Sequence, residues 1–395
     1  MSEAISPFLS GTWTGATGQN VIADLAFDET YIYASLITSP GKVVKINRAS
    51  MATVAVWTAP AGVNSANVMT YDGSHLYVGF DTANVPTKII KVDPATMATV
   101  ATYVCADETQ TYCLSIAYDN DYIYVAPENH ANGAAYIFKV DKTTMLAVDS
   151  WSGGDTVDQA VFLTMDATRL YALVPATANN GTSTVFKINP ATMETDGSPW
   201  VGVFVAEDYP LGQYGGAHLT YDGTALYASL STIPAQVVRI NPATMATVSA
   251  WIAGEGDDEA VWAAYSEDYL YVTTSVGGFH RVAKATMLTA ANFTPATTIS
   301  SVAFDGIYAY GGDGASPAHI YRIGFDGKAV QHDTDAAFLE TNKDEIIDDD
   351  TAILAEFGVT GTAAGGTIVG GYPIGNDNIG PYPVDTTHIG PYPLQ

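Results

Sequence analysis

The chain is poor in charge, and above all in positive charge. Charged residues make up 14% of its 395 residues, and 15 Lys and Arg stand against 42 Asp and Glu, which gives a formal net charge of −27. Binding to nucleic acids or to anionic membranes depends on basic side chains that replace counterions at phosphate groups. We therefore predict no nucleic-acid partner and no anionic membrane partner.

Long apolar runs and a secretory leader are also lacking. No stretch approaches the roughly 18 apolar residues of a membrane span, and residues 1–7 have neither the basic start nor the apolar core of a signal peptide. We predict no membrane insertion. If the protein works outside a cell, we expect it to leave by another route, such as release within a virus particle.

Cysteine is nearly absent. Cys105 and Cys113 flank the short segment 106–112, so they could clip that loop as a disulfide or remain two half-buried free thiols. Neither alternative fixes the compartment.

What the chain does contain is one pattern in seven copies, with a period of roughly 45 residues, as in repeat architectures. The first half of each copy has an apolar strand, a turn of Asp-Gly or Asp-Asn type and an aromatic second strand, which is typical of a tight hairpin. These halves lie at 25–36, 69–80, 116–127, 163–174, 219–230, 263–274 and 302–312.

The second half of each copy predicts a third strand, a type I turn and a fourth strand. Its consensus, Val-x-x-Ile-Asn-Pro-Ala-Thr-Met, has an Asx side chain that caps the turn and a proline that presets φ. These halves lie at 43–57, 89–103, 137–151, 185–200, 237–251, 279–293 and 320–330. The two halves form repeats 1 to 7, each predicted to be a four-stranded antiparallel meander, as in a propeller blade.

The N-terminal segment supplies a strand that repeat 7 lacks. Trp13 precedes Asp28 by the same spacing that separates Trp57 from Asp72, while repeat 7 loses the Met-Ala-Thr-Val-Trp ending. Residues 5–14 are therefore predicted to be the closing strand of the last blade, which removes the free sheet edge. The expected fold is an all-β, seven-bladed β-propeller over residues 1–330.

These motifs resemble the YVTN and NHL-like seven-bladed β-propellers. The resemblance rests on Tyr-Asp-Gly followed by Leu-Tyr-Val, on the Asn/Asp-Pro-Ala-Thr turn and on Tyr-Val-Thr-Thr at 271–274, and it covers residues 5–330. It implies the fold but no single function, because that family includes surface proteins, binding modules and a few enzymes.

A basic residue and a methionine recur in the second half of the repeats. We interpret each basic residue as an outward strand residue that pairs with a neighbouring acidic side chain, and the methionines as packing between blades. The basic residues are Lys45, Lys91, Lys139, Lys187, Arg239, Arg281 and Arg322. The methionines are Met51, Met97, Met145, Met193, Met245 and Met287.

The loops opposite the tight turns vary between copies, so we predict a contact face for a glycan or a receptor there. The alternative is a rim of solvated polar loops. The candidate binding residues are Glu128, His130, Asp155, Asp158, Asp208, Tyr209, Tyr214, Asp257 and Asp258.

No catalytic signature supports an enzyme. The histidines fall at different repeat positions without metal-ligand spacing, although His130 and His218 are the best placed. We therefore predict a protein that is not an enzyme, has no catalytic residues and needs no cofactor, apart from the calcium considered next. The alternative is a lyase-like or lactonase-like propeller enzyme with a divalent metal at the channel mouth.

Beyond the repeats, residues 331–358 predict an acidic linker with two short helices. Asn342, Asp344 and Asp348 occupy ligand positions of a calcium loop of the EF-hand or dockerin type, but Glu340, Glu345 and Thr351 depart from it. Calcium binding and a solvated acidic linker are the two interpretations.

Residues 359–395 are rich in Gly, Pro and Tyr and predict an extended docking tail, with a disordered tail as the alternative. Its evenly spaced contact residues are Tyr372, Tyr382 and Tyr392. We expect the tail to attach the protein to other subunits. The resulting prediction is a structural or binding protein of an extracellular assembly, such as a virion surface, decoration or tail protein. The alternative to an assembly protein is a cell-surface glycan-binding or protein-binding module.

Overall fold

The computed structural model describes residues 7–82, 86–105, 110–129, 135–153, 161–175, 182–202, 216–294 and 297–325. Contacts between Cα atoms divide the chain into two units, Met1–Ala329 and Val330–Gln395. All described residues belong to the first unit. The predicted short helices and docking tail lie outside the described residues.

The described residues form antiparallel β-sheets without an α-helix, which confirms the prediction of an all-β protein. Nor does this part of the chain hold any helix with the length and apolar character that crossing a bilayer requires. The strands of repeats 1 to 3 are β2 (Ile22–Phe27), β3 (Tyr31–Leu36), β4 (Lys42–Asn47), β5 (Thr53–Thr58), β6 (Asn64–Tyr71), β7 (Leu76–Asp81), β8 (Lys88–Asp93), β9 (Ala98–Val104), β10 (Gln110–Tyr118), β11 (Tyr122–Asn129), β12 (Tyr136–Asp141) and β13 (Ala147–Ser152).

Repeats 4 to 7 continue the same order, with one interruption. In repeat 4 the fourth strand is split into two short pieces, both paired with the third strand, where the chain carries Gly197 and Pro199. The strands are β14 (Phe162–Met165), β15 (Leu170–Val174), β16 (Thr184–Asn189), β17 (Glu194–Thr195), β18 (Trp200–Val201), β19 (Gly216–Tyr221), β20 (Leu226–Leu230), β21 (Gln236–Asn241), β22 (Ala246–Ile252), β23 (Ala260–Tyr265), β24 (Tyr269–Thr274), β25 (Phe279–Ala283), β26 (Leu288–Phe293), β27 (Ile299–Phe304), β28 (Ala309–Asp313) and β29 (His319–Gly324).

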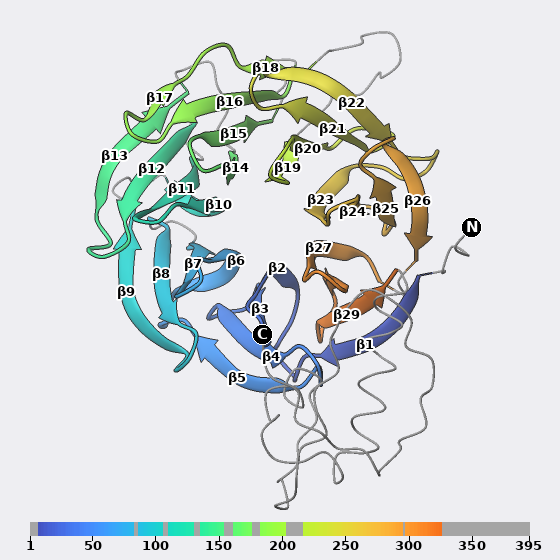
Figure 1. Cartoon of the computed structure of the whole chain (residues 1–395). Helices are drawn as coiled ribbons and strands as arrows, with labels where there is room; N and C mark the ends of the chain where they lie inside the picture. The colour runs from blue at the N-terminus through green and yellow to red at the C-terminus, as the bar shows by residue number, and fades with distance from the viewer. Residues whose placement is uncertain are drawn as a thin grey trace, which may run out of the picture. The chain divides into compact units, whose positions relative to one another are not determined.

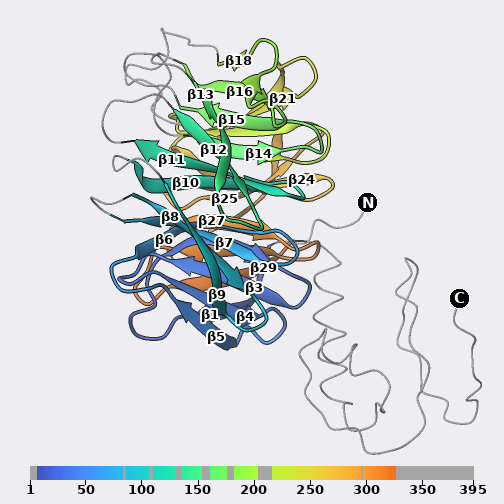
Figure 2. The same cartoon turned by 90° about the vertical axis from the view of Figure 1, so that its left-hand side faces the viewer.

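Within this unit the sheets follow one another around a ring, and the first strand of each repeat lies nearest the centre (Figure 1). Figure 2, seen from the side of β9 and β13, shows these outer strands in front of their sheets. Each sheet is a meander, so the first–second and third–fourth connections share one end of the ring, which we call the turn rim. The other end is the loop rim.

Both ends of the described chain meet in one sheet. β1 (Phe8–Thr14) pairs antiparallel with β29, with Trp13 opposite Ile320 and Thr12 opposite Tyr321. The sheet order is β1-β29-β28-β27, so the N-terminal strand takes the fourth position of repeat 7. Among the described strands, β7 and β10 form the one other ladder pairing between two repeats, through Asp81 and Tyr112.

Burial falls from the inner to the outer strands. The second strands β15 and β20 are buried along their whole length, whereas in β13 only Trp151 is buried. Sheets that are covered on both faces need continuous apolar strands rather than alternating ones. The aromatic second strands therefore form the core between neighbouring sheets.

Tryptophans of five fourth strands join their repeats to the next ones. Each indole N–H donates to a threonine hydroxyl on the following fourth strand, so a large apolar ring is buried while its polar group is satisfied. The pairs are Trp13–Thr53, Trp57–Thr99, Trp151–Thr195, Trp200–Thr247 and Trp251–Thr289, at 2.8–3.1 Å.

The recurrent methionines end the third–fourth turns in a left-handed conformation. All six have φ between 50° and 53°, a region that costs about 1–2 kcal/mol for a residue with a side chain. The Met51 amide donates to Asn47 O at 2.9 Å, and its side chain packs with Trp13 and Ile320 of the neighbouring sheet. Packing between sheets therefore holds a backbone conformation that would otherwise favour glycine.

Candidate functional site

The recurrent basic residues donate to backbone carbonyls within the described part of the chain, whereas acidic side chains were expected as their partners. Lys45 Nζ donates to Pro94 O at 2.8 Å, and Lys139 Nζ donates to Pro190 O at 2.7 Å. In every repeat the acceptor is the backbone carbonyl of the residue directly after the third strand of the next repeat. The other donor–acceptor pairs are Lys91–Lys142, Lys187–Pro242, Arg239–Lys284, Arg281–Phe325 and Arg322–Arg48.

The prediction of acidic partners was wrong because the side chain lies against the neighbouring sheet rather than in solvent. Lys45 and Arg281 are each only 8% exposed. A carbonyl at the end of a turn satisfies a buried cation without placing a second charge in the interface. The last of these bonds returns from Arg322 to Arg48, so the series runs from each repeat to the next and back to repeat 1.

A second recurrent feature of the turn rim is an aspartate in the first–second turn. Asp28 accepts from the amides of Thr30 and Tyr31, and its other oxygen accepts from the Tyr33 hydroxyl at 2.7 Å. The same aspartate–tyrosine hydrogen bond recurs at Asp119–Tyr124, Asp166–Tyr171, Asp222–Tyr227 and Asp305–Tyr310. Repeat 6 has Ser266 in this place.

Three of these aspartates also receive a cation from the next repeat. Arg48 Nη2 lies 2.6 Å from Asp305 Oδ2, Lys142 Nζ lies 2.7 Å from Asp72 Oδ2, and Lys284 Nζ contacts Asp222 Oδ2. The three cations occupy the position directly after the third strand of their repeat, where Pro94, Pro190 and Pro242 stand in other repeats.

The two lysine ion pairs lower the pKa of their carboxyls. Burial raises the pKa of Asp72 and of Asp222, but hydrogen bonds from Lys142 and Lys284 outweigh it and hold both values below the ordinary range. The carboxylates are therefore charged at neutral pH and firmly held.

Each cation also lies beside an aromatic ring of its own repeat. Lys142 Nζ is 4.9 Å from the centroid of Tyr118, and Lys284 Nζ is 5.9 Å from that of Tyr265. Arg48 Cζ is 5.8 Å from that of Phe27. We define a turn-acid site as the turn aspartate of one repeat together with the residue before the turn of the next repeat.

Three turn-acid sites have a proline where the cation would be. They combine Asp28 with Tyr71, Asp119 with Met165, and Asp166 with Tyr221. In the described part of the chain, no Lys, Arg or His nitrogen lies within 4.0 Å of these three aspartates.

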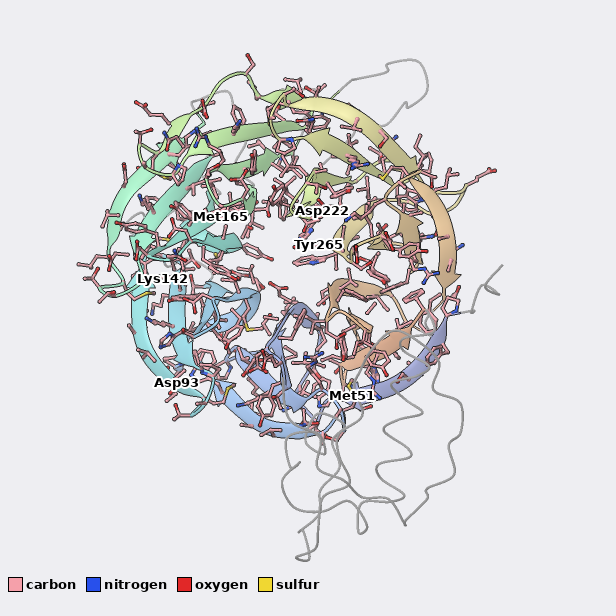
Figure 3. The ribbon with its side chains drawn as sticks, viewed as in Figure 1. Met51, Asp93, Lys142, Met165, Asp222 and Tyr265 are labelled. Atoms are coloured by element: carbon pink, nitrogen blue, oxygen red, sulfur yellow. The ribbon has the colours of Figure 1, made fainter. Side chains whose placement is uncertain are left out.

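Two cavities open near these sites. One, of about 870 Å³, is lined by Asp222, Tyr265 and the cations Lys284 and Arg239. The other, of about 690 Å³, is lined by Asp119, Asp166 and residues without positive charge, which include Tyr118, Met165, Tyr221 and Tyr265. Figure 3 places Met165, Asp222 and Tyr265 around the centre of the ring, with Asp93 and Met51 at its periphery.

The inner strands carry two further titratable groups in unusual surroundings. Burial raises the pKa of Asp24 to about 7, although the amides of Met69 and Leu25 favour its charged form. Desolvation lowers the pKa of His218 to about 3, and its ring stacks on Trp262 with centroids 4.3 Å apart. His218 is therefore a neutral part of the aromatic wall at physiological pH.

On the loop rim, three of the predicted binding residues are described. Glu128 is half-buried on β11, where it pairs with Tyr112. Asp257 Oδ2 lies 3.5 Å from Nε2 of His280, and the Asp258 carbonyl accepts from Ser275. The structure thus places Asp257 beside a histidine that the sequence did not single out, and brings neither aspartate together with Glu128.

The remaining predicted residues lie outside the described part of the chain. They are His130, Asp155, Asp158, Asp208, Tyr209 and Tyr214 of the loop rim, Asn342, Asp344 and Asp348 of the acidic linker, and Tyr372, Tyr382 and Tyr392 of the tail. Cys105 and Cys113 are buried free thiols rather than a disulfide. Among the described residues, no group of three or more His, Cys, Asp or Glu side chains is arranged to hold a metal ion.

The turn-acid sites escaped prediction, although a signal for them existed. The residue directly after the third strand is a cation in repeats 1, 3 and 6 and a proline in repeats 2, 4 and 5, and this difference marks which turn aspartates are neutralised. No known protein family matches the chain. A comparison with curated proteins finds no relative either.

Proposed function

We propose that the seven repeats form a seven-bladed β-propeller closed by the N-terminal strand, and that the protein is a non-enzymatic structural or binding component of an extracellular assembly. The assembly type that we favour is a virion, with the protein as a surface, decoration or tail component. The observation that carries the proposal is the series of cation-to-carbonyl bonds that runs from repeat to repeat and returns from Arg322 to Arg48.

These bonds support the proposal of a rigid scaffold because the recurrent basic side chains connect neighbouring repeats. The turn aspartates are used in the same way, since each described one accepts backbone amides and most accept a tyrosine hydroxyl. Polar groups that are fixed on both sides provide a stable ring that can present surface features to a partner.

We also propose that the C-terminal tail attaches the protein to the assembly, and a deletion tests this attachment. Protein lacking residues 360–395, and a second variant in which Tyr372, Tyr382 and Tyr392 are replaced by serine, would be expressed in the native host. We expect both variants to fold, as judged by unchanged thermal unfolding, and to be lost from the purified assembly. Normal incorporation of either variant would contradict the docking role of the tail.

A further inference from the structure

Three turn-acid sites show which chemical group the geometry accepts. At Asp72 and Asp222 the occupant is a lysine ammonium, and at Asp305 it is an arginine guanidinium. In each case the cation lies on the carboxylate and within 6 Å of an aromatic ring, which is the arrangement for combined ionic and cation–π attraction. Three turn-acid sites of this chain are thus occupied by cationic side chains of the chain itself.

Two adjacent turn-acid sites have no such occupant from the described residues, and they share one cavity. Asp119 with Met165 and Asp166 with Tyr221 both line the cavity of about 690 Å³. The Tyr221 ring stacks on Tyr171, whose hydroxyl is bonded to Asp166, so the aromatic wall extends to the carboxylate. Tyr118 and Tyr265, which are 37% and 41% exposed, complete the aromatic lining.

The neighbouring cations have other partners. Lys139 and Lys187 donate to Pro190 O and Pro242 O, and Arg169 Nε lies 2.6 Å from Asp196 Oδ2. Asp119 and Asp166 are only partly buried, so a cation from outside the chain can reach them.

We propose that this cavity, between Asp119 and Asp166, binds a primary alkylammonium group. The ammonium would take the place that Lys142 and Lys284 occupy at the equivalent sites, and the alkyl chain would lie against Met165 and the tyrosine rings. Two sources carry this chemistry, a free aliphatic amine and the lysine side chain of a polypeptide. The net charge of −27 favours the approach of either cation.

The test uses n-butylammonium as the probe and the full chain labelled with ¹³C at the methionine methyl groups. The Met165 signal is assigned by its loss in Met165→Leu. We expect the probe to shift this signal with a Kd of about 1–10 mM, because an exposed ion pair and a cation–π contact are each weak. Neutral n-butanol controls for apolar contact, and the peptide acetyl-Gly-Lys-Gly-amide distinguishes lysine side chains from free amines.

Variants that supply the missing lysine give the sharpest contrast. Pro190→Lys and Pro242→Lys restore the residue found at Lys142 and Lys284, so together they should weaken butylammonium binding at least about tenfold. Ala243→Lys adds the same charge at the exposed neighbouring position and should leave Kd within about twofold. Asp119→Asn with Asp166→Asn removes the carboxylates without changing the turns and should also abolish binding.

A positive control comes from an occupied site. Lys284→Ala empties the site at Asp222, and butylammonium should raise the Tm of this variant more than that of the wild type. The proposal is overturned if 50 mM butylammonium leaves the Met165 signal unchanged, if n-butanol shifts it equally, or if the lysine variants bind the probe like the wild type. A response to a neutral sugar such as maltose without a response to butylammonium would assign the cavity to a glycan and overturn it as well.

Discussion

Two sectors of the turn rim are built from the same hairpins but differ in how their acids are neutralised. Between repeats 5 and 6, Asp222 is paired with Lys284 beside Tyr265. Between repeats 4 and 5, Asp166 and Tyr221 occupy the same places, and Pro242 stands where the lysine would be. The residue in the third–fourth turn therefore decides whether the turn aspartate of the preceding repeat is paired with a lysine of the chain or has no such partner.

This difference is compatible with a constant fold because proline and lysine both suit the turn. Proline presets φ at this position, whereas Lys142 and Lys284 use their own amides to bond Asp121 O and Asp268 O. The backbone is satisfied in both versions, so side-chain charge can vary without altering the sheets. We therefore expect turn aspartates that are paired with a cation to contribute to stability, and turn aspartates without such a cation to contribute little.

The largest effect is expected at the Arg48–Asp305 pair, whose arginine makes further hydrogen bonds. The Asp305 side chain is 1% exposed, and Arg48 also donates to the carbonyls of Asp28 and Glu29. Arg48→Met should lower the free energy of unfolding by about 3–4 kcal/mol, because it leaves a buried carboxylate unpaired. Urea denaturation measures this change.

Arg169→Met is the matched control, since the Arg169–Asp196 pair is 31% and 40% exposed. It should cost less than about 1 kcal/mol. Equal losses in the two variants would show that burial of the pair does not govern its contribution.

A somewhat smaller effect is expected at Lys284, and it should depend on pH. Lys284→Met should cost about 2–3 kcal/mol at pH 7, because it removes the partner of Asp222. The folded state holds the pKa of Asp222 below its unfolded value, so the contribution is complete above about pH 4 and is lost as the pH falls further. Unfolding measured at pH 7 and pH 3 should show the variant and the wild type converging at acid pH; a constant gap would argue against the ion pair.

The opposite pH dependence is expected at Asp24, a buried carboxyl that has amide partners. Its pKa of about 7 in the folded state means that the folded state binds the proton more tightly than the unfolded state. Stability should therefore be highest below about pH 4 and should fall progressively as the pH rises to 8.

Asp24→Asn removes this titration, so its unfolding free energy should lack that decline between pH 4 and 8. Thermal unfolding across this range measures both proteins. If the stability of the wild type instead rises between pH 4 and 8, and rises more than that of the variant, the pKa of Asp24 is not raised in the folded state.

The smallest effect is expected at the open site. Asp166→Asn keeps Oδ1 as the acceptor of the Thr168 and Arg169 amides, lets the new amide nitrogen donate to the Tyr171 hydroxyl oxygen, and breaks no ion pair, so it should cost less than about 1 kcal/mol. Asp222→Asn, the same change in the paired sector, should cost about 2 kcal/mol because it leaves Lys284 without its carboxylate. Urea denaturation of the two variants tests the comparison directly, and a greater loss at Asp166 would break it.

The sequence predicted the sheets well because their determinants are local. Turn residues, strand alternation and the spacing from Trp13 to Asp28 together located the strands and predicted a closing strand at residues 5–14, and β1 pairs with β29. The partners of the basic residues were predicted wrongly, because those contacts cross from one repeat to the next. The repeat pattern indicates that a basic residue recurs at the position of Lys45. The packing of neighbouring sheets is needed to show that Lys45 reaches Pro94 O.

The turn methionines also determine how the protein responds to oxidants. Met51, Met145, Met193 and Met287 are at most 8% exposed, and each follows the same turn in its repeat. Oxidation to the sulfoxide makes the side chain polar and would disrupt its packing between sheets. Because these four sulfurs are covered, they should resist peroxide until one sheet opens, and damage should then spread to the neighbouring repeats.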